Sequence, residues 1–412
     1  MNGTILVCNV GSSSIKFTVF DILQGGRSER LVHGEIESRP GGFTFHVDDE
    51  QGSEIVHESI ESDVPRPVDH LLKWLSDHAK GRTLLGVGHR IVHGGAEFIQ
   101  PVCITPEILE KLERLTPFAP LHQTATLAPA RAIASYAPDL LQVACFDTAF
   151  HQTIPEMARL LPLPRSYEKK GVRRYGFHGL SYTWISSRLK EIDPDLYQGR
   201  TIIAHLGSGA SLCALKNGKS HETTMGFSAL DGLMMGTRSG AIDPGVLLYM
   251  IQEEGAGWAS MVETLYRQAG LVGVSGVSAD MRTLREKLKD ETDPETHLHM
   301  EQAVSLFSYR IIEEIGALVA IMEGVDGLVF TGGIGEHDAV LRSDVCARLS
   351  WLGLTFDEDA NQVNGPVISA AGSAIKVRVV PTDEEAVIMR EVLSFVTDRS
   401  DQTMSAHIRS MS

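Results

Sequence analysis

Alternating apolar and polar positions dominate the first quarter of the chain and predict β-strands. The segments LVHGEIES, GFTFHVDDE and SEIVHESIE alternate in this way and are separated by Gly, Pro and Asp, as strands are. Apolar residues then recur at helical spacing from Pro65 to Lys80, and Thr105-Pro106 supplies an N-cap and a first-turn proline for a second helix, EILEKLERL. The apolar run LLQVACF predicts a buried strand that ends at Asp147.

The second half of the chain predicts a similar order of elements. Strands are expected at TIIAHLG and SLCALKNG, helices at DPGVLLYMIQEEG and from Glu295 to Glu323, and a buried strand at DGLVFTGG before a Gly-rich turn. The segment TDEEAVIMREVLSFV predicts a last amphipathic helix, and the polar tail from Asp398 is expected to be disordered. Strands that alternate with helices favour an α/β fold with a mostly parallel sheet.

The two halves open with similar hairpins, NVGSSSIKF and HLGSGASLC, in which Gly11 aligns with Gly207 and Ser12 with Ser208. A chain of 412 residues is too long for one compact core, so the repetition predicts a duplicated α/β domain. Backbone N–H groups and hydroxyls of such turns can bind phosphates, although Gly-Ser is also ordinary hairpin chemistry.

Composition narrows the class of function. The formal charge of −16 argues against nucleic acid and anionic membranes as partners, so the positive charge that binds an anionic ligand must be local. The five cysteines are scattered and form no metal or redox pair, which predicts reduced and mostly buried thiols. No basic segment precedes a signal-like run at the N-terminus, and the longest apolar run, ALVAIM, is short. We therefore expect a soluble cytoplasmic protein.

Several common phosphate and metal signatures are missing from the sequence. The segment CALKNGKS has Cys213 where a P-loop needs glycine, and GSGASL, GVGHRI and GIGEHD lack the last glycine of the dinucleotide fingerprint. No HExxH motif or cysteine cluster suggests zinc. The sequence therefore predicts neither a P-loop enzyme nor a dehydrogenase.

The remaining candidates for chemistry are charged residues in loops or at strand ends. Arg90 lies in VGHRIVHGG, Asp147 in ACFDTAFHQT, His178 in RRYGFHGLSY and Arg238 in MGTRSGAIDPG, and TGGIGEHD is a Gly-rich turn. Each has an ordinary structural explanation as a surface ion pair, a core histidine or a helix cap. Their combination across both halves favours a functional site.

These motifs, read in chain order, resemble those of the acetokinase family, in the superfamily of sugar kinases, heat-shock proteins and actin. The resemblance covers nearly the whole chain, through NVGSSSIKF, GHRIVHGG, FDTAFHQTIP, RRYGFHG, HLGSG, GLMMGTRSGAIDPG, FTGGIGEH and PTDEEAVIMRE. It implies a homodimer with duplicated actin-like (ribonuclease H-like) domains and a nucleotide cleft between them. It also implies reversible, Mg²⁺-dependent transfer of the γ-phosphoryl group of ATP to acetate, which gives acetyl phosphate and ADP.

The resemblance also implies domain roles. Residues 1–150 would form the acceptor-side domain, on which a C-terminal helix at 385–397 packs back. Residues 151–384 would form the nucleotide-binding domain, and 398–412 a polar tail.

A carboxylate acceptor has a pKa of about 4–5 and is already an anion at neutral pH, so it needs positioning and charge neutralisation more than a general base.

Residue roles follow from the same resemblance. Arg90 would bind the substrate carboxylate, His178 and Arg238 would stabilise the transferring phosphoryl group, and Asp147 would orient the reacting groups or the metal. The apolar substrate wall would be Val92, Leu121, Phe177 and Ala229. The nucleotide would be bound by Lys16, His205, Leu206, Gly207, Ser208, Gly209, Asp280, Met281, Arg282, Gly333, Ile334, Gly335, Glu336 and His337. Asn9 and Glu384 would bind Mg²⁺, with Mn²⁺ as the alternative ion.

Four positions depart from the family pattern. Ser208 stands where the family has Asn, Tyr182 where it has His, and Ala229 where it has Pro. The segment HQTATL, which begins at His122, stands in place of an Asn-Pro-Pro-Asn-like run. A smaller residue in the pocket wall changes discrimination by ~1–3 kcal/mol, so propionate or butyrate is an alternative substrate to acetate. An actin-like ATP-binding regulator and a kinase of another small alcohol or sugar are the competing functions. The acceptor-side arginine argues against the regulator, and the apolar wall argues against the alcohol or sugar kinase.

Overall fold

The computed structural model describes residues 3–10, 14–39, 41–61, 67–78 and 81–411, with side chains to residue 399. The chain divides into two compact units, the first made of residues 1–149 and 383–412 and the second of residues 150–382. Gly11 and Ser12 of the predicted first Gly-Ser turn lie outside the described residues.

The first unit is built on a mixed sheet of eight strands, in the order β5-β4-β3-β2-β1-β6-β8-β7. Strands β1 to β5 form an antiparallel meander, while β6 runs parallel to β1 and β8 parallel to β6. The strands are β1 (Gly3–Val10), β2 (Ser14–Ile22), β3 (Ser28–Arg39), β4 (Gly42–Asp49), β5 (Glu54–Glu61), β6 (Leu84–Ile91), β7 (Val102–Cys103) and β8 (Gln142–Phe146). The helices are α1 (Pro67–His78), α2 (Pro106–Glu113), α3 (Gln123–Tyr136) and α16 (Glu384–Met411).

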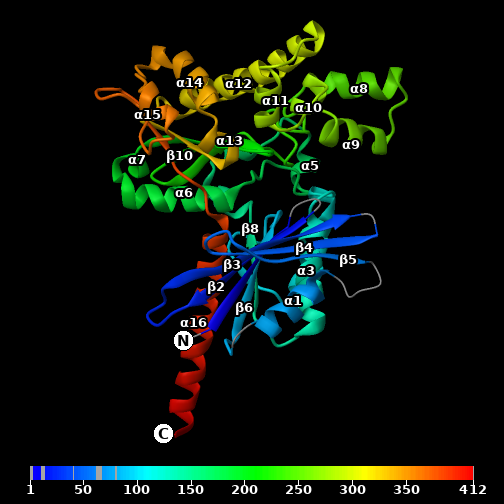
Figure 1. Cartoon of the computed structure of the whole chain (residues 1–412), viewed down its shortest axis with the longest axis vertical. Helices are drawn as coiled ribbons and strands as arrows, with labels where there is room; N and C mark the ends of the chain where they lie inside the picture. The colour runs from blue at the N-terminus through cyan, green and yellow to red at the C-terminus, as the bar shows by residue number, and fades with distance from the viewer. Residues whose placement is uncertain (1–2, 11–13, 40, 62–66, 79–80, 412) are drawn as a thin grey trace. The chain divides into compact units, whose positions relative to one another are not determined.

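Side-chain alternation in β6 explains how helices cover both faces of this sheet. Val87 joins a buried core with Leu71 of α1 and Ile133 of α3. The next residue, Gly88, faces the opposite side of the sheet. It lies so close to Ile388 of α16 that a Cβ on this glycine would be 2.3 Å from the Ile388 Cγ2 atom. The last helix of the chain thus packs on the face opposite α1 and α3, as Figure 1 shows.

The second unit has a five-stranded sheet in the order β11-β10-β9-β12-β13. Its strands are β9 (Arg200–Leu206), β10 (Ala210–Lys216), β11 (Lys219–Thr223), β12 (Gly327–Thr331) and β13 (Lys376–Val379). Figure 1 shows α6 and the long α12 on opposite sides of this sheet. The helices are α4 (Glu156–Arg159), α5 (Arg165–Glu168), α6 (Gly179–Ile192), α7 (Pro194–Gln198), α8 (Pro244–Glu253), α9 (Trp258–Arg267), α10 (Gly270–Ser275), α11 (Met281–Lys287), α12 (Pro294–Met322), α13 (Gly332–His337), α14 (Ala339–Arg348) and α15 (Glu358–Gln362).

The same five-strand arrangement occurs in both units. In the first, β3-β2-β1 are antiparallel and are followed by β6 and β8, parallel to β1; in the second, β11-β10-β9 are antiparallel and are followed by β12 and β13, parallel to β9. The predicted duplicated α/β fold is therefore confirmed. The expected mostly parallel sheet is wrong, because each half opens with a hairpin meander, which forces antiparallel neighbours.

The predicted disorder from Asp398 is also wrong, since α16 continues to Met411. The sequence has no Gly or Pro after Thr382 to end the helix. The five cysteines, all in the described part of the chain, are free thiols and four of them are buried, as predicted. None of the helices in the described ranges combines the length and the apolar character needed to cross a membrane.

Candidate functional site

Three polar side chains meet where parallel strands of the first unit end. Arg90 lies near the end of β6, opposite Cys145 of β8, and Asp147 follows β8 directly. Asn9 lies near the end of β1, which is parallel to β6. Because the carboxyl ends of parallel strands share one edge of a sheet, residues from three separate motifs are brought together there.

Arg90 and Asp147 form a close ion pair. The Arg90 Nη2 atom donates to Asp147 Oδ2 at 2.7 Å, and Arg90 Nε donates to the same carboxylate at 3.0 and 3.1 Å. Arg90 Nη1 donates to the Asn9 side-chain oxygen at 3.1 Å. The Asp147 side chain is only 2% exposed, so the arginine satisfies a carboxylate that would otherwise be costly to bury.

The charges around Arg90 keep it protonated. Burial disfavours the guanidinium charge, but the carboxylates of Asp147 and Glu384 outweigh burial and raise the pKa of Arg90 above its usual value. Glu384 is the first residue of α16, so this helix brings its charge to the unit from the far end of the chain. Lys16 is exposed and pairs across β1 and β2 with Asn9. Of the predicted wall, Val92 is buried and Leu121 half-buried in this unit.

In the second unit, His178 is held in an unusual backbone conformation at the start of α6. Its φ of 57° and ψ of 23° are left-handed, a conformation that costs a non-glycine residue free energy and is retained only where the surroundings impose it. The side chain is 8% exposed. Strain of this kind is common at functional sites, and here it falls on a residue that the sequence singled out.

The imidazole of His178 is oriented by two neighbours. Its Nδ1 atom lies 2.8 Å from the Ser211 hydroxyl, which also hydrogen bonds to the buried Tyr182 hydroxyl. The ring stacks on His205 with centroids 4.3 Å apart, and the Ser181 hydroxyl lies 2.8 Å from His205 Nδ1. In the sequence, Tyr182 stands out only as a departure from the family pattern. Ser211 was not predicted, and its signal is a hydroxyl within the apolar strand ASLCALK.

Arg238 and His178 converge on the Gly-Ser turn between β9 and β10. A Cβ built on Gly209 would lie 2.9 Å from Arg238 Nη2 and 3.1 Å from His178 Nε2, so both groups approach this glycine closely. The Ala229 carbonyl accepts a hydrogen bond from Arg238 Nη1 at 2.7 Å, and the Gly236 N–H donates to the Ser208 carbonyl at 3.1 Å. Phe177, also predicted for the wall, is buried in this unit.

A cavity of about 680 Å³ opens beside this turn within the second unit. It brings together residues from three of the predicted nucleotide segments: Gly207, Ser208, Asp280, Met281, Arg282, Gly333, Ile334 and His337. Nine further lining residues were not predicted from the sequence: Ala279, Arg285, Glu286, Lys289, Asp338, Ala339, Val340, Gln362 and Asn364. Arg285 and Lys289 follow Arg282 at helical spacing, which was the available signal.

Five residues of the second unit that were predicted to bind nucleotide do not line this cavity: His205, Leu206, Gly209, Gly335 and Glu336. The Glu336 carboxylate instead accepts hydrogen bonds from the backbone N–H groups of Gly332 at 2.8 Å and Thr382 at 3.1 Å. Gly332 itself has a φ of 78° and a Cβ there would lie 2.7 Å from the Leu206 carbonyl oxygen. Glu336 therefore shapes the Gly-rich turn rather than facing the cavity.

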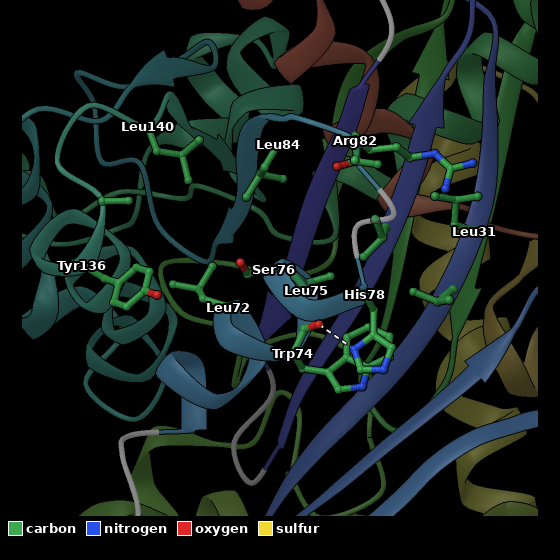
Figure 2. Close-up of a pocket in the computed structure, with 15 residues that line it drawn as sticks. Leu31, Leu72, Trp74, Leu75, Ser76, His78, Arg82, Leu84, Tyr136 and Leu140 are labelled. Atoms are coloured by element: carbon green, nitrogen blue, oxygen red, sulfur yellow. Dashed lines mark hydrogen bonds between the residues drawn. The ribbon is translucent and has the colours of Figure 1, made fainter.

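The first unit has a separate apolar cavity of about 560 Å³, drawn in Figure 2. Thr4 and Leu84, from the beginnings of β1 and β6, line it, whereas Asn9 and Arg90 lie at the other ends of these strands. Trp74 stacks on His78 at its wall, with ring centroids 4.5 Å apart. This cavity is thus distinct from the cluster around Arg90.

Comparison with known proteins agrees with this arrangement. The acetokinase family model matches residues 4–390. The chain is 45% identical to an acetate kinase of Nitrobacter hamburgensis over 97% of this chain and 98% of that one. An acetate kinase structure from Porphyromonas gingivalis is 39% identical, with a TM-score of 0.84 over 95% of this chain and 99% of that one. A propionate kinase structure from Francisella tularensis is 33% identical, with a TM-score of 0.86 over 94% of this chain and 98% of that one.

Matches of this identity and extent confirm the resemblance seen in the motifs and the two-unit, actin-like α/β fold. The chain belongs to the acetokinase family.

Proposed function

We propose that this protein is an acetate kinase, which transfers the γ-phosphoryl group of ATP reversibly to acetate and forms acetyl phosphate and ADP. Membership of the acetokinase family supports a carboxylate as the acceptor. The observation in the structure that carries the proposal is the convergence of His178 Nε2 and Arg238 Nη2 on the bare Cα of Gly209. Two donors that meet at a glycine turn suit a phosphoryl group better than an uncharged ligand.

Arg90 is the residue that binds the acceptor in this proposal. Its bonds to Asp147 and Asn9 use the Nε–H group and one N–H on each terminal nitrogen, so within the described residues a further N–H on each remains for a substrate carboxylate. Asp147 acts by fixing the plane of the guanidinium. The acetate anion then needs no general base, because its own oxygen is the nucleophile.

His178 and Arg238 neutralise charge that develops on the phosphoryl oxygens during transfer. Ser211 orients the imidazole through Nδ1, and the Ala229 carbonyl orients the guanidinium through Nη1. Both donors are held before the substrate arrives, which is the property that makes electrostatic stabilisation effective. The loss of either donor should cost on the order of 3 kcal/mol of barrier, a factor of about 100 in rate.

The first unit also offers the oxygen atoms that Mg²⁺ prefers. The Asn9 amide oxygen and the Glu384 carboxylate both belong to the surroundings of Arg90, and hard oxygen donors fit Mg²⁺ or Mn²⁺. We propose these two residues as its ligands, with Lys16 facing phosphate. Bound there, the ion would neutralise phosphate charge. ATP in the cavity of the second unit, a homodimer and a cytoplasmic location belong to the same proposal.

An acyl-hydroxamate assay with MgATP tests this function directly. Acetate, propionate and butyrate are compared at limiting concentrations, and Arg90→Ala, His178→Ala and Arg238→Ala serve as variants. We expect acetate to give the highest kcat/KM and each variant to lose about 100-fold or more. A protein that binds ATP but gives no hydroxamate with any acid would be an ATP-binding regulator, and the proposal would be abandoned.

Propionate kinase is the second candidate, and one residue favours it. Ala229 stands where the family pattern has proline, and the similar solved structures include a propionate kinase. The variant Ala229→Pro keeps the carbonyl that Arg238 uses and restores bulk. If the wall sets specificity, the ratio of kcat/KM for propionate over acetate should fall by about tenfold in this variant.

A further inference from the structure

A cluster of histidines and carboxylates lies at the edge of the first unit's sheet, on strands that the phosphoryl-transfer residues do not occupy. His46 lies on β4, and Glu54 and His57 lie on β5, the edge strand. Among the described residues this is the group of three such side chains whose ligand atoms all lie within 4.8 Å of one another. Figure 1 shows β4 and β5 side by side.

The cluster depends on an irregularity in the strand pairing. Glu54 and His57 are three residues apart, so in a regular strand they would point to opposite faces. The register shifts between Val47 and Asp48, whose partners are Val56 and Glu54, and Ile55 is the extra residue. Such bulges redirect side chains, and this one places Glu54 on the same face as His57.

The opposite face of β4 is part of the core, which leaves the cluster on the outer face. Phe45 and Val47 are fully buried and pack in the core that includes Leu71 of α1. His46 and Asp48 alternate with them and therefore point away from α1. The side chains of His46, Glu54 and His57 are 37%, 60% and 58% exposed, so an ion in solution has access to them.

Two of the distances between the donor atoms are close to those of a first coordination shell, and all three atoms lie within 4.8 Å of one another. His46 Nε2 lies 3.6 Å from Glu54 Oε2, and His57 Nδ1 lies 3.3 Å from the same oxygen. In a tetrahedral site with bonds of about 2.0–2.1 Å, neighbouring donor atoms are about 3.3 Å apart. Asp48 Oδ1 lies 3.1 Å from His46 Nε2, but Asp48 is not one of the three side chains whose ligand atoms all lie close together.

We propose that His46, Glu54 and His57 form a binding site for a divalent transition-metal ion of the Zn²⁺ type, with water as the remaining ligand. Two imidazoles and one carboxylate suit Zn²⁺ and its neighbours, whereas Mg²⁺ prefers oxygen donors alone. A bound ion would link the edge strand β5 to β4 through side chains, in addition to the backbone pairing of the two strands. The site is independent of the residues assigned to acetate, ATP and Mg²⁺.

The experiment is calorimetric titration of the full-length, untagged and metal-stripped protein with ZnCl₂. The variants are His46→Ala, His57→Ala, Glu54→Gln and the double variant His46→Ala/His57→Ala. His297→Ala is the matched control, because His297 is also exposed and pairs with one carboxylate, Glu301, at 3.4 Å. Thermal unfolding with and without excess Zn²⁺ is the second readout, since an ion that binds the folded state raises Tm.

We expect one saturable Zn²⁺ equivalent that is lost in the double variant, weakened at least ~10-fold in each single variant and unchanged in the control. The Zn²⁺-dependent rise in Tm should disappear with it. Zn²⁺ bound near Arg90 would still be seen in the titration of the double variant, which distinguishes it from Zn²⁺ bound by His46 and His57. Absence of Zn²⁺ binding by the unaltered protein, full binding by the double variant, or an equal loss in His297→Ala would each overturn the proposal.

Discussion

At the scale of single residues, the site is organised by side chains that hold other side chains. Asp147 holds Arg90, and the Tyr182–Ser211 pair holds His178. Asp147 and Ser211 are both buried, and each forms a hydrogen bond with the side chain that it orients. Removal of one partner therefore affects both the burial of polar groups and the geometry of the functional group.

Asp147→Asn tests whether this carboxylate positions Arg90 or acts as a base. The amide keeps the shape but loses the charge and one acceptor, so the grip on the Arg90 guanidinium weakens. We expect kcat/KM for acetate to fall about 100-fold, mostly through KM for acetate. Because a positioning residue neither gives up nor takes up a proton during the reaction, the fall should be the same at every pH from 6 to 9. A loss that varies with pH would indicate proton transfer instead.

Tyr182→Phe removes the hydroxyl that contacts Ser211. We expect kcat to fall up to about tenfold with little change in KM for ATP, because the imidazole is less well oriented while the cavity is unchanged. Tyr197→Phe is the matched control, since Tyr197 packs in the same core without a hydroxyl contact to Ser211. Steady-state kinetics of both variants would decide, and equal effects on kcat would reduce Tyr182 to a packing role.

At the scale of elements, α16 completes the first unit from the other end of the chain. Its Ile388 and Val392 fill the space over Gly86 and Gly88 of β6. The Thr18 hydroxyl on β2 donates to Glu385 at 2.8 Å, and Arg30 on β3 pairs with Asp383 at 2.6 Å. The helix thus brings Glu384 to the charge cluster and covers the second face of the sheet.

Gly88→Ala should loosen this packing. The new Cβ would lie 2.3 Å from Ile388 Cγ2, a clash that forces the helix to move and lowers the free energy of unfolding by about 1–3 kcal/mol. Ile388→Ala should cost about 2–5 kcal/mol by leaving a cavity. In the double variant the two defects compensate in part, so the total should be smaller than their sum. Urea unfolding of all four proteins measures this coupling, and strict additivity would contradict the contact.

At the scale of the whole molecule, each unit contains a buried histidine that is neutral in the folded state. Burial lowers the pKa of His89 in the first unit to about 4, although its contact with Gln142 opposes this. Burial also lowers the pKa of His151 in the second unit to about 4, against a hydrogen bond to Phe177 and with help from the charge of Arg174. In an unfolded chain both would titrate near 6.5.

Both units should therefore lose stability in acid. Below pH 6.5 the unfolded chain binds protons that the folded histidines refuse, so stability is complete above 6.5 and falls as the pH drops toward 4. The full loss is ~3 kcal/mol for each histidine. Urea midpoints measured from pH 7 to pH 4.5 should decline, and His151→Asn should decline less steeply. Equal slopes for the variant and the unaltered protein would exclude His151 as a cause.

Local sequence patterns and motifs are enough to predict many secondary-structure elements, the duplication and several candidate site residues of this protein. Alternation and helical spacing predict most strands and the helices α1, α2, α8, α12 and α16, because each element must place its apolar side on a core. The repeated Gly-Ser hairpin indicates the duplication. Arg90 and Asp147 stand out beside apolar runs, and His178 and Arg238 stand out in glycine-containing segments. Family membership also follows from the motifs alone, and the comparisons confirm it.

The contacts between the candidate residues, and the role of each side chain in them, become visible only in the tertiary structure. The bidentate grip of Asp147 on Arg90, the Ser211 contact of His178 and the return of α16 to β6 join residues far apart in the chain. The bulge that turns Glu54 toward His57 depends on strand register, which a single strand does not reveal. Sequence pattern reports what each segment buries, whereas partners are chosen by how the segments pack, and that choice requires the whole fold.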